Sequence, residues 1–185
     1  MTTVDFTKRY GAIDGLVIVT MKQVTDDRGT VRELFRRSAF DAADVVFGRI
    51  EQVNLTETSE RGAVRGMHAE SMTKLVTVAH GLARGLYVDA RTGSATFGVV
   101  DEVDLEPGVE VLVPSGVANG FQALVPGTQY AYCFDHEWSP TMPGVAFNPL
   151  DPLVADRWPL EFDSADPRYL STKDRDAPAF AAVCS

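Results

Sequence analysis

One short segment of the chain combines residues that could bind an anion and move a proton. The segment 60–68 reads ERGAVRGMH and places Arg65 and His68 on what reads as a strand interrupted by glycines. A histidine accepts a proton near neutral pH, and a guanidinium clamps an anion through two parallel hydrogen bonds. A glycine lets a ligand or a second backbone approach closely. A surface ion pair for Arg65 and a core position for His68 would produce the same pattern, so other parts of the chain must decide.

The length, charge and composition of the chain exclude several classes of protein. Its 185 residues predict a single domain over residues 1–185, long enough to bury a hydrophobic core. A net charge of −9 argues against nucleic acid or an anionic membrane as a partner. No signal-peptide pattern is visible, and no apolar run reaches the ~20 residues of a membrane helix. With Cys133 and Cys184 expected as free thiols, the sequence predicts a cytoplasmic protein.

Short β-rich runs separated by glycine and proline must position these residues. This spacing predicts an all-β protein, an antiparallel sandwich or barrel. Residues 37–46 predict one short helix with Ser38 as its N-cap, and the proline-rich tail from Asn148 predicts a wrapping arm with short turns. The predicted strand runs are residues 15–20, 47–55, 74–79, 82–90, 97–105, 109–113, 121–125 and 129–134.

Two pairs of polar residues share one face of a predicted strand. Gln52 and Asn54 form one pair, and Tyr130 and Tyr132 form the other. Alternate residues of a barrel strand face the same side. Each pair therefore lies either on the solvent side or along a polar cavity, and the pattern does not choose between them.

Six motifs, in order along the chain, resemble one enzyme family. Together they span most of residues 26–180, and the family that they resemble is the dTDP-4-dehydrorhamnose 3,5-epimerases. The resemblance implies a dimeric jelly-roll (cupin-like) fold and proton transfer at C3, C5 or both of a dTDP-4-keto-6-deoxyhexose, with no cofactor and no metal. The motifs are QxN (52–54), RGxxRGMH (61–68), KLV (74–76), VDARxGSxTFG (88–98), VPxGxAxGF (113–121) and LSxKD (170–174).

The resemblance also implies a set of catalytic residues. His68 matches the family's base and Asp174 its carboxylate partner, which would fix the imidazole tautomer. Tyr132 matches the proton donor, and Lys74 matches a lysine beside the sugar 4-oxygen, where an ammonium would stabilise an enolate. Without the family, a surface carboxylate, a core tyrosine and a strand-edge lysine would be the simpler interpretations.

Other matched positions are implied to bind the substrate. Arg65 matches an arginine on the diphosphate, and Arg28 matches one that is supplied across a homodimer from an N-terminal strand. Glu33 and Gln52 are expected around the nucleotide, and Asn54, on the same strand face as Gln52, is expected to bind the substrate. Asn119 is expected to line the sugar pocket.

Three departures from the family pattern surround the sugar rather than the nucleotide. Asn119 replaces the usual histidine, so it can donate a hydrogen bond but cannot carry charge. The link between His68 and Lys74 is short, and within it Glu70 replaces a glutamine. Val31 replaces a phenylalanine. These changes suggest an altered substrate or regiochemistry, as in antibiotic or other secondary metabolism.

Three rival functions remain open. A metal-dependent cupin needs a histidine cluster with a carboxylate, whereas His80 and His136 fall in segments separate from His68. A sugar-nucleotide 3,4-ketoisomerase shares the proton abstraction at C3 but returns the proton to C4. A non-catalytic dTDP-sugar-binding protein would need the arginines but none of the proton-transfer residues.

Overall fold

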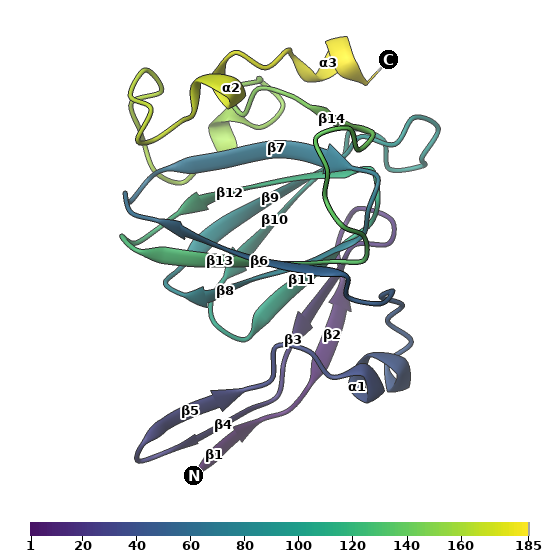
Figure 1. Cartoon of the computed structure of the whole chain (residues 1–185), viewed down its shortest axis with the longest axis vertical. Coiled ribbons are helices and arrows are strands. Elements are labelled where there is room, and N and C mark those ends of the chain that lie inside the picture. The colour runs from purple at the N-terminus through teal and green to yellow at the C-terminus, as the bar shows by residue number, and fades with distance from the viewer. Residues whose placement is uncertain (185) are drawn as a thin grey trace.

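The protein is built almost entirely from antiparallel β-strands, arranged as two facing sheets and a smaller third one (Figure 1). A computed structural model describes residues 1–184. The six-stranded sheet has the order β2-β3-β11-β8-β13-β6, formed by β2 (Thr7–Tyr10), β3 (Val17–Thr20), β11 (Val109–Val113), β8 (Lys74–His80), β13 (Thr128–Phe134) and β6 (Gln52–Thr58). The five-stranded sheet has the order β10-β9-β12-β7-β14, formed by β10 (Val100–Leu105), β9 (Ala83–Asp89), β12 (Val117–Ala123), β7 (Val64–Glu70) and β14 (Gly144–Ala146).

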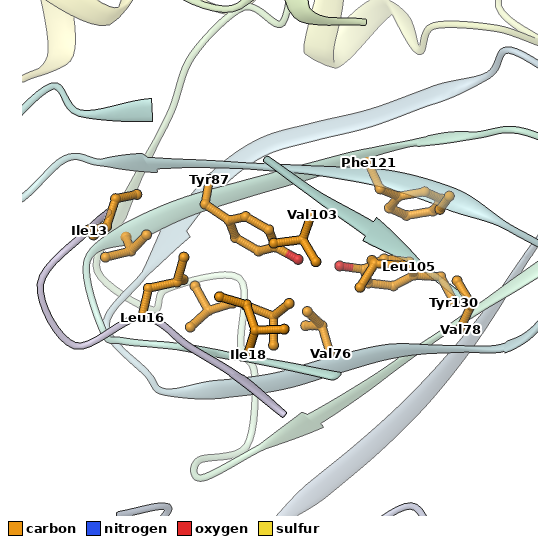
Figure 2. Packing of buried hydrophobic residues seen from close by; sticks show 14 residues of the cluster. Ile13, Leu16, Ile18, Val76, Val78, Tyr87, Val103, Leu105, Phe121 and Tyr130 are labelled. Atoms are coloured by element: carbon orange, nitrogen blue, oxygen red, sulfur yellow. The ribbon is translucent and has the colours of Figure 1, made fainter. Parts of the chain in front are cut away.

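The main hydrophobic core lies between these two sheets. Alternating side chains of both sheets point inward, as the period of two along each strand requires, and pack into one cluster (Figure 2). Phe121 of β12 stacks on Tyr130 of β13 with ring centroids 4.0 Å apart. Figure 2 shows the hydroxyl groups of Tyr87 and Tyr130 pointing toward each other inside this core. The double-sheet architecture confirms the predicted all-β antiparallel fold.

The outer faces of both sheets are covered by non-strand segments. The C-terminal segment, with η1 (Ala155–Arg157), α2 (Thr172–Arg175) and α3 (Phe180–Val183), lies over the five-stranded sheet (Figure 1). Trp158 and Leu170 anchor this segment in an apolar cluster. On the outside of the six-stranded sheet, Phe40 of α1 (Arg37–Ala42) packs with Phe47 in a third cluster.

Several predicted boundaries are wrong. Ser38 is not the N-cap of α1, because the helix begins one residue earlier and Arg36 occupies the cap without a side-chain hydrogen bond. In the run 47–55 the strand begins only at Gln52, because Phe47 is not part of the sheet and packs in the third cluster. The run 121–125 is shifted, because β12 spans Val117–Ala123.

A three-stranded sheet near the N-terminus projects away from the two main sheets (Figure 1). It consists of β1 (Thr2–Val4), β4 (Gln23–Asp26) and β5 (Gly29–Arg32) in the order β1-β4-β5. All three residues of β1 are exposed, so no burial pattern marks this sheet in the sequence. Within residues 1–184, no helix is long and apolar enough to cross a membrane.

Candidate active site

A cavity of about 590 Å³ opens between the two main sheets and the C-terminal segment. Its wall combines side chains from β7 and β12 of the five-stranded sheet with side chains from β8 and β13 of the six-stranded sheet. Segments 57–60 and 167–174 complete it. The volume falls in the range typical of small-molecule sites. The predicted residues on this wall are Arg65, His68, Lys74, Asn119, Tyr132 and Asp174.

The imidazole of His68 is held by Asp174. His68 Nε2 lies 2.8 Å from Asp174 Oδ1, and the two side chains are 35% and 10% exposed. An ionised carboxylate only accepts hydrogen bonds, so Nε2 carries the proton and donates it to Asp174. The lone pair of the neutral ring therefore lies on Nδ1. This arrangement leaves His68 able to accept a proton while its orientation is fixed.

Asp174 reaches His68 because α2 is fixed at its first turn. Ser171 caps α2, with its Oγ accepting a hydrogen bond of 3.1 Å from the backbone N–H of Asp174. The preceding Leu170 is buried against the five-stranded sheet. Burial of Asp174 opposes its ionisation, but the hydrogen bond and charge of His68 outweigh it, so the pKa of the carboxyl lies below its ordinary value.

Tyr132 enters the cavity from the other sheet. It lies on β13, between Asn54 of β6 and Val76 of β8 in the strand register. Its ring packs against Tyr130, with centroids 4.7 Å apart, so the predicted shared face of these two tyrosines is confirmed. Burial raises the pKa of Tyr132 to about 12, while the charge of Arg65 opposes the rise. The phenol is therefore protonated at neutral pH.

A close contact of two glycines fixes the backbone of β7 beside β12. Gly66 has a φ of +129°, and a Cβ at this position would lie 2.5 Å from the Cα of Gly120. Only glycine fits this combination of left-handed backbone and close approach. Two residues after Gly66, the strand register places His68 of β7 opposite Asn119 of β12. The glycine noted in the sequence thus serves a strand contact near the base.

Lys74 sits deep in the wall, in a cluster with Glu70 and Asn119. Its Nζ forms an ion pair with a carboxylate oxygen of Glu70, and it donates hydrogen bonds to Asn119 Oδ1 at 2.5 Å and to the backbone oxygen of His68 at 3.2 Å. Burial lowers the pKa of Lys74, and the Glu70 carboxylate partly offsets this. The short link between His68 and Lys74 brings Glu70 into this contact.

Two arginines lie on the cavity wall. Arg65 donates a hydrogen bond of 3.2 Å from Nε to Thr58 Oγ1 and forms no ion pair within residues 1–184. Arg168 belongs to the C-terminal segment and pairs with Asp166 at 2.6 Å. A guanidinium free of carboxylates is available to a phosphate oxygen. Arg65 is therefore equipped to bind an anionic part of a ligand.

Four predicted substrate-binding residues lie elsewhere in the chain. Arg28 is on the projecting sheet, where it pairs with Asp26 at 2.6 Å, and Glu33 follows the same sheet and pairs with Arg36. Gln52 donates a hydrogen bond of 3.0 Å to Asn54 on β6, outside the cavity wall. Within one chain these residues are thus not brought to the cavity.

The sequence interpretation assigned no role to four charged residues of the wall, which are Glu57, Glu60, Glu70 and Arg168. Glu70 was noted only as a departure, yet its position two residues after His68 on β7 places it on the same strand face. Arg168 was not singled out, although it precedes the 170–174 motif by two residues. Within residues 1–184, no group of three or more His, Cys, Asp or Glu side chains is arranged to hold a metal ion.

The fold and the cavity define the class of protein. Two facing antiparallel sheets with a polar cavity between them form the jelly-roll, or cupin-like, architecture of many small-molecule enzymes. A model of the dTDP-4-dehydrorhamnose 3,5-epimerase family matches residues 11–182. The dTDP-4-dehydrorhamnose 3,5-epimerase of Streptomyces griseus is 32% identical over 178 residues, covering 93% of this chain and 86% of that protein. The chain belongs to the dTDP-4-dehydrorhamnose 3,5-epimerase family and is an isomerase.

Solved structures of similar proteins agree with this assignment. NovW, described as a 4-keto-6-deoxy sugar epimerase from the novobiocin biosynthetic gene cluster of Streptomyces spheroides, superposes with a TM-score of 0.87 at 27% identity. The match covers 100% of this chain and 98% of NovW. RmlC from Legionella pneumophila, solved with dTDP-4-keto-L-rhamnose, gives a TM-score of 0.86 at 30% identity and covers 97% and 95% of the two chains. The predicted family and fold class are confirmed.

Proposed function

We propose that this protein epimerises a dTDP-4-keto-6-deoxyhexose at C3, C5 or both, by proton transfer through an enolate and without a cofactor. The observation that carries the proposal is the pairing of His68 with Asp174 on one sheet, with Tyr132 entering the same cavity from the other sheet. Proteins of similar structure act on, or are bound to, 4-keto-6-deoxy sugars or their dTDP forms. NovW further supports a role in deoxysugar biosynthesis for an antibiotic.

The chemistry requires a base and an acid on different sides of the sugar ring. The 4-keto group acidifies the adjacent C–H bonds, and Nδ1 of His68 takes the proton while Asp174 stabilises the imidazolium that forms. The electron pair moves onto the carbonyl oxygen as an enolate. Tyr132 then donates its phenolic proton to the ring carbon from the opposite face. A phenol that is fully protonated at neutral pH is ready for this step.

We propose that the sugar and the diphosphate occupy different parts of the cavity. We assign Arg65 to the diphosphate because its guanidinium lies on the wall without a carboxylate partner in residues 1–184. Arg168, on the C-terminal side of the cavity, adds a second cation there. Glu33 and Gln52 are assigned to the nucleotide end, as the family resemblance implies, and Asn54 is assigned to substrate binding because it shares a strand face with Gln52.

A homodimer would complete the site. The side chain of Arg28 is 89% exposed on the projecting sheet and is not part of the cavity wall of its own chain. Val53 and Leu55 of β6 are 61% and 59% exposed, and apolar exposure of this kind marks contact surfaces. We propose that the projecting sheet of each subunit delivers Arg28 to the partner's cavity. The free thiols of Cys133 and Cys184 suit a cytoplasmic enzyme.

Incubation with dTDP-4-keto-6-deoxyglucose in deuterated water, followed by NMR, tests the function. Deuterium at C5, at C3 or at both, together with inverted product, is the expected result and gives the regiochemistry. No exchange above that of a His68→Ala variant would overturn the proposal for this substrate. A carbonyl that moves to C3 would instead identify a 3,4-ketoisomerase.

A further inference from the structure

Glu70 presents one free carboxylate oxygen to the cavity. Its other oxygen, Oε2, forms the ion pair with Lys74. Oε1 makes no hydrogen bond within residues 1–184 and is not enclosed there, since the Glu70 side chain is 21% exposed and lines the cavity wall. A carboxylate accepts hydrogen bonds and donates none. The cavity wall therefore contains an acceptor that residues 1–184 leave without a partner.

The position of this carboxylate is fixed by strands on both sides of β7. The strand register pairs Glu70 with Gly144 of β14, and the backbone oxygen of Glu70 accepts a hydrogen bond of 3.1 Å from the N–H of Gly116, just before β12. The ion pair with Lys74, whose side chain is only 4% exposed, holds the carboxylate itself. Binding groups on rigid strands are placed more accurately than those on loops. Oε1 is thus in position before a ligand binds.

The order of residues along β7 matches the order of groups in a nucleotide sugar. Arg65, which we assign to the diphosphate, comes first, the base His68 follows, and Glu70 lies about 7 Å beyond His68 along the strand. All three residues line the cavity. The diphosphate is attached to C1 of the sugar, and C4 lies across the ring from C1. A ring beside His68 therefore extends its C4 end away from Arg65 and toward Glu70.

The Lys74 ammonium indicates where the carbonyl group of the sugar lies. Its Nζ donates a hydrogen bond of 3.2 Å to the backbone oxygen of His68, so this charge lies beside the base. An enolate develops negative charge on its oxygen, which such a cation stabilises. C4 and its oxygen therefore face Lys74. Because Glu70 contacts the same ammonium, it lies beside a substituent of a ring carbon next to C4.

Only one of the two carbons next to C4 carries a substituent that suits a carboxylate. C5 of a 6-deoxyhexose carries a methyl group, which would displace water from the charge without replacing its hydrogen bonds. C3 carries a hydroxyl group, or an amino group in amino sugars, and both of these groups donate hydrogen bonds. The substituent beside Oε1 of Glu70 is therefore that of C3.

We propose that Glu70 is a specificity-determining residue that accepts, through Oε1, a hydrogen bond from a hydroxyl or amino group on C3 of the sugar. The inference rests on the proposed function and names the substituent that the substrate must carry. A glutamine, the residue that the family pattern has here, would turn its amide oxygen to Lys74, which only donates, and would present an N–H₂ group to the cavity. The carboxylate of this chain thus replaces a donor by an acceptor.

Binding of three stable sugar nucleotides, measured by calorimetry, tests the inference without turnover. The ligands are dTDP-6-deoxyglucose, its 3-deoxy analogue and its 3-amino-3-deoxy analogue, whose C4 carries a hydroxyl group so that no epimerisation can occur. The wild type should bind the 3-hydroxyl or the 3-amino ligand about 10- to 100-fold more tightly than the 3-deoxy ligand, as expected for a hydrogen bond to a charged group. The tighter of the two identifies the donor that the site prefers.

Glu70→Gln should remove this preference for a donor on C3. The preference for the 3-amino over the 3-deoxy ligand should fall to within threefold, because an ammonium group cannot accept a hydrogen bond from the amide. The preference for the 3-hydroxyl ligand should fall by about tenfold, since a neutral hydrogen bond replaces a charged one. Each ratio compares two ligands on the same variant, so a general loss of stability or of charge at Lys74 cancels.

Glu57→Gln is the matched control. It removes an exposed carboxylate from the same cavity wall, and it should leave both ratios as in the wild type. Equal binding of the three ligands by the wild type would overturn the inference alone, and so would a preference that Glu70→Gln leaves unchanged. Failure of the wild type to bind any of the three would overturn the proposed function as well.

Discussion

His68 serves as a base only while one ring nitrogen keeps its lone pair. The hydrogen bond from Nε2 to Asp174 leaves that lone pair on Nδ1, and the ionised carboxylate then stabilises the imidazolium. The lowered pKa of Asp174 keeps this partner charged at neutral pH. The tautomer of His68 is thus set by a residue that lies 106 positions away in the chain.

Asp174→Asn removes this control. The amide of the variant can turn its N–H₂ group toward His68, which selects the wrong tautomer, so kcat is expected to fall by ~10²–10⁴-fold with KM nearly unchanged. Steady-state kinetics give both constants. Asp176→Asn, an exposed change two residues further on, is the matched control. Equal kcat in both variants would mean that Asp174 does not act through His68.

The candidate site could be predicted from the sequence only through motifs. Spacing alone left Arg65 and His68 open to a structural interpretation, and nothing local connects His68 with Asp174. The family motifs linked His68 with Asp174, and the structure places these two side chains in contact. The ion pair of Glu70 with Lys74 was not predicted, because it forms across the turn between β7 and β8, whose geometry no motif specifies.

At the scale of elements, the contact between β7 and β12 aligns the base with the cavity. Gly66→Ala places a Cβ 2.5 Å from Gly120 Cα in a backbone with positive φ. We expect the free energy of unfolding to fall by ~2–4 kcal/mol, and kcat to fall because His68 moves. Denaturant unfolding and kinetics measure the two effects.

Gly93→Ala is the control for this prediction. Gly93 also has a positive φ, +84°, but no atom lies within 4 Å of the added Cβ. It should therefore show the conformational cost alone, ~1 kcal/mol, with full activity. A Gly66→Ala variant no less stable and no less active than Gly93→Ala would contradict the role of the close contact.

The elements that the sequence predicted well are strands with buried apolar residues. Residues 109–113 and 129–134 form β11 and β13, which place Val111 and Tyr130 in the main core. The projecting sheet was not predicted, since β1, β4 and β5 have no buried side to impose a pattern. The prediction of Ser38 as the N-cap of α1 was wrong, because the packing of Phe40 in the third cluster and not the capping preference of serine sets the start of the helix.

At the scale of the whole molecule, one buried carboxyl couples stability to pH. Glu110 of β11 is 1% exposed, and neither of its oxygens has a hydrogen-bond partner within residues 1–184. Burial raises its pKa to about 9. The folded protein therefore holds a proton that the unfolded chain releases above the ordinary glutamate pKa.

This raised pKa predicts the direction of the pH effect. The contribution of Glu110 is fully present below the unfolded pKa and is lost as pH rises toward 9, because the unfolded state binds fewer protons. Between pH 6 and 8 the wild type should lose ~3 kcal/mol more than Glu110→Gln, which cannot ionise. Urea unfolding at both pH values measures this, and equal losses in the two proteins would refute it.

The position of Arg28 on the projecting sheet predicts that its removal weakens substrate binding in the partner's cavity. Because Arg28 would reach a partner's diphosphate, Arg28→Ala should raise KM by ~10-fold while kcat stays close to wild type. Light scattering must show a dimer in both proteins. Arg9→Ala, an exposed change on β2, is the control. An unchanged KM, or a fully active monomer, would contradict the shared site.

The central claim, a base and an acid on opposite sides of the sugar, is tested most directly with Tyr132→Phe in deuterated water. His68 is intact in this variant, so deuterium should still enter the substrate at the carbon that the wild type epimerises. The proton must then return from the side of His68, so the configuration should be retained. Deuterium incorporation with inversion at the wild-type rate would show that Tyr132 is not the acid and would contradict the mechanism.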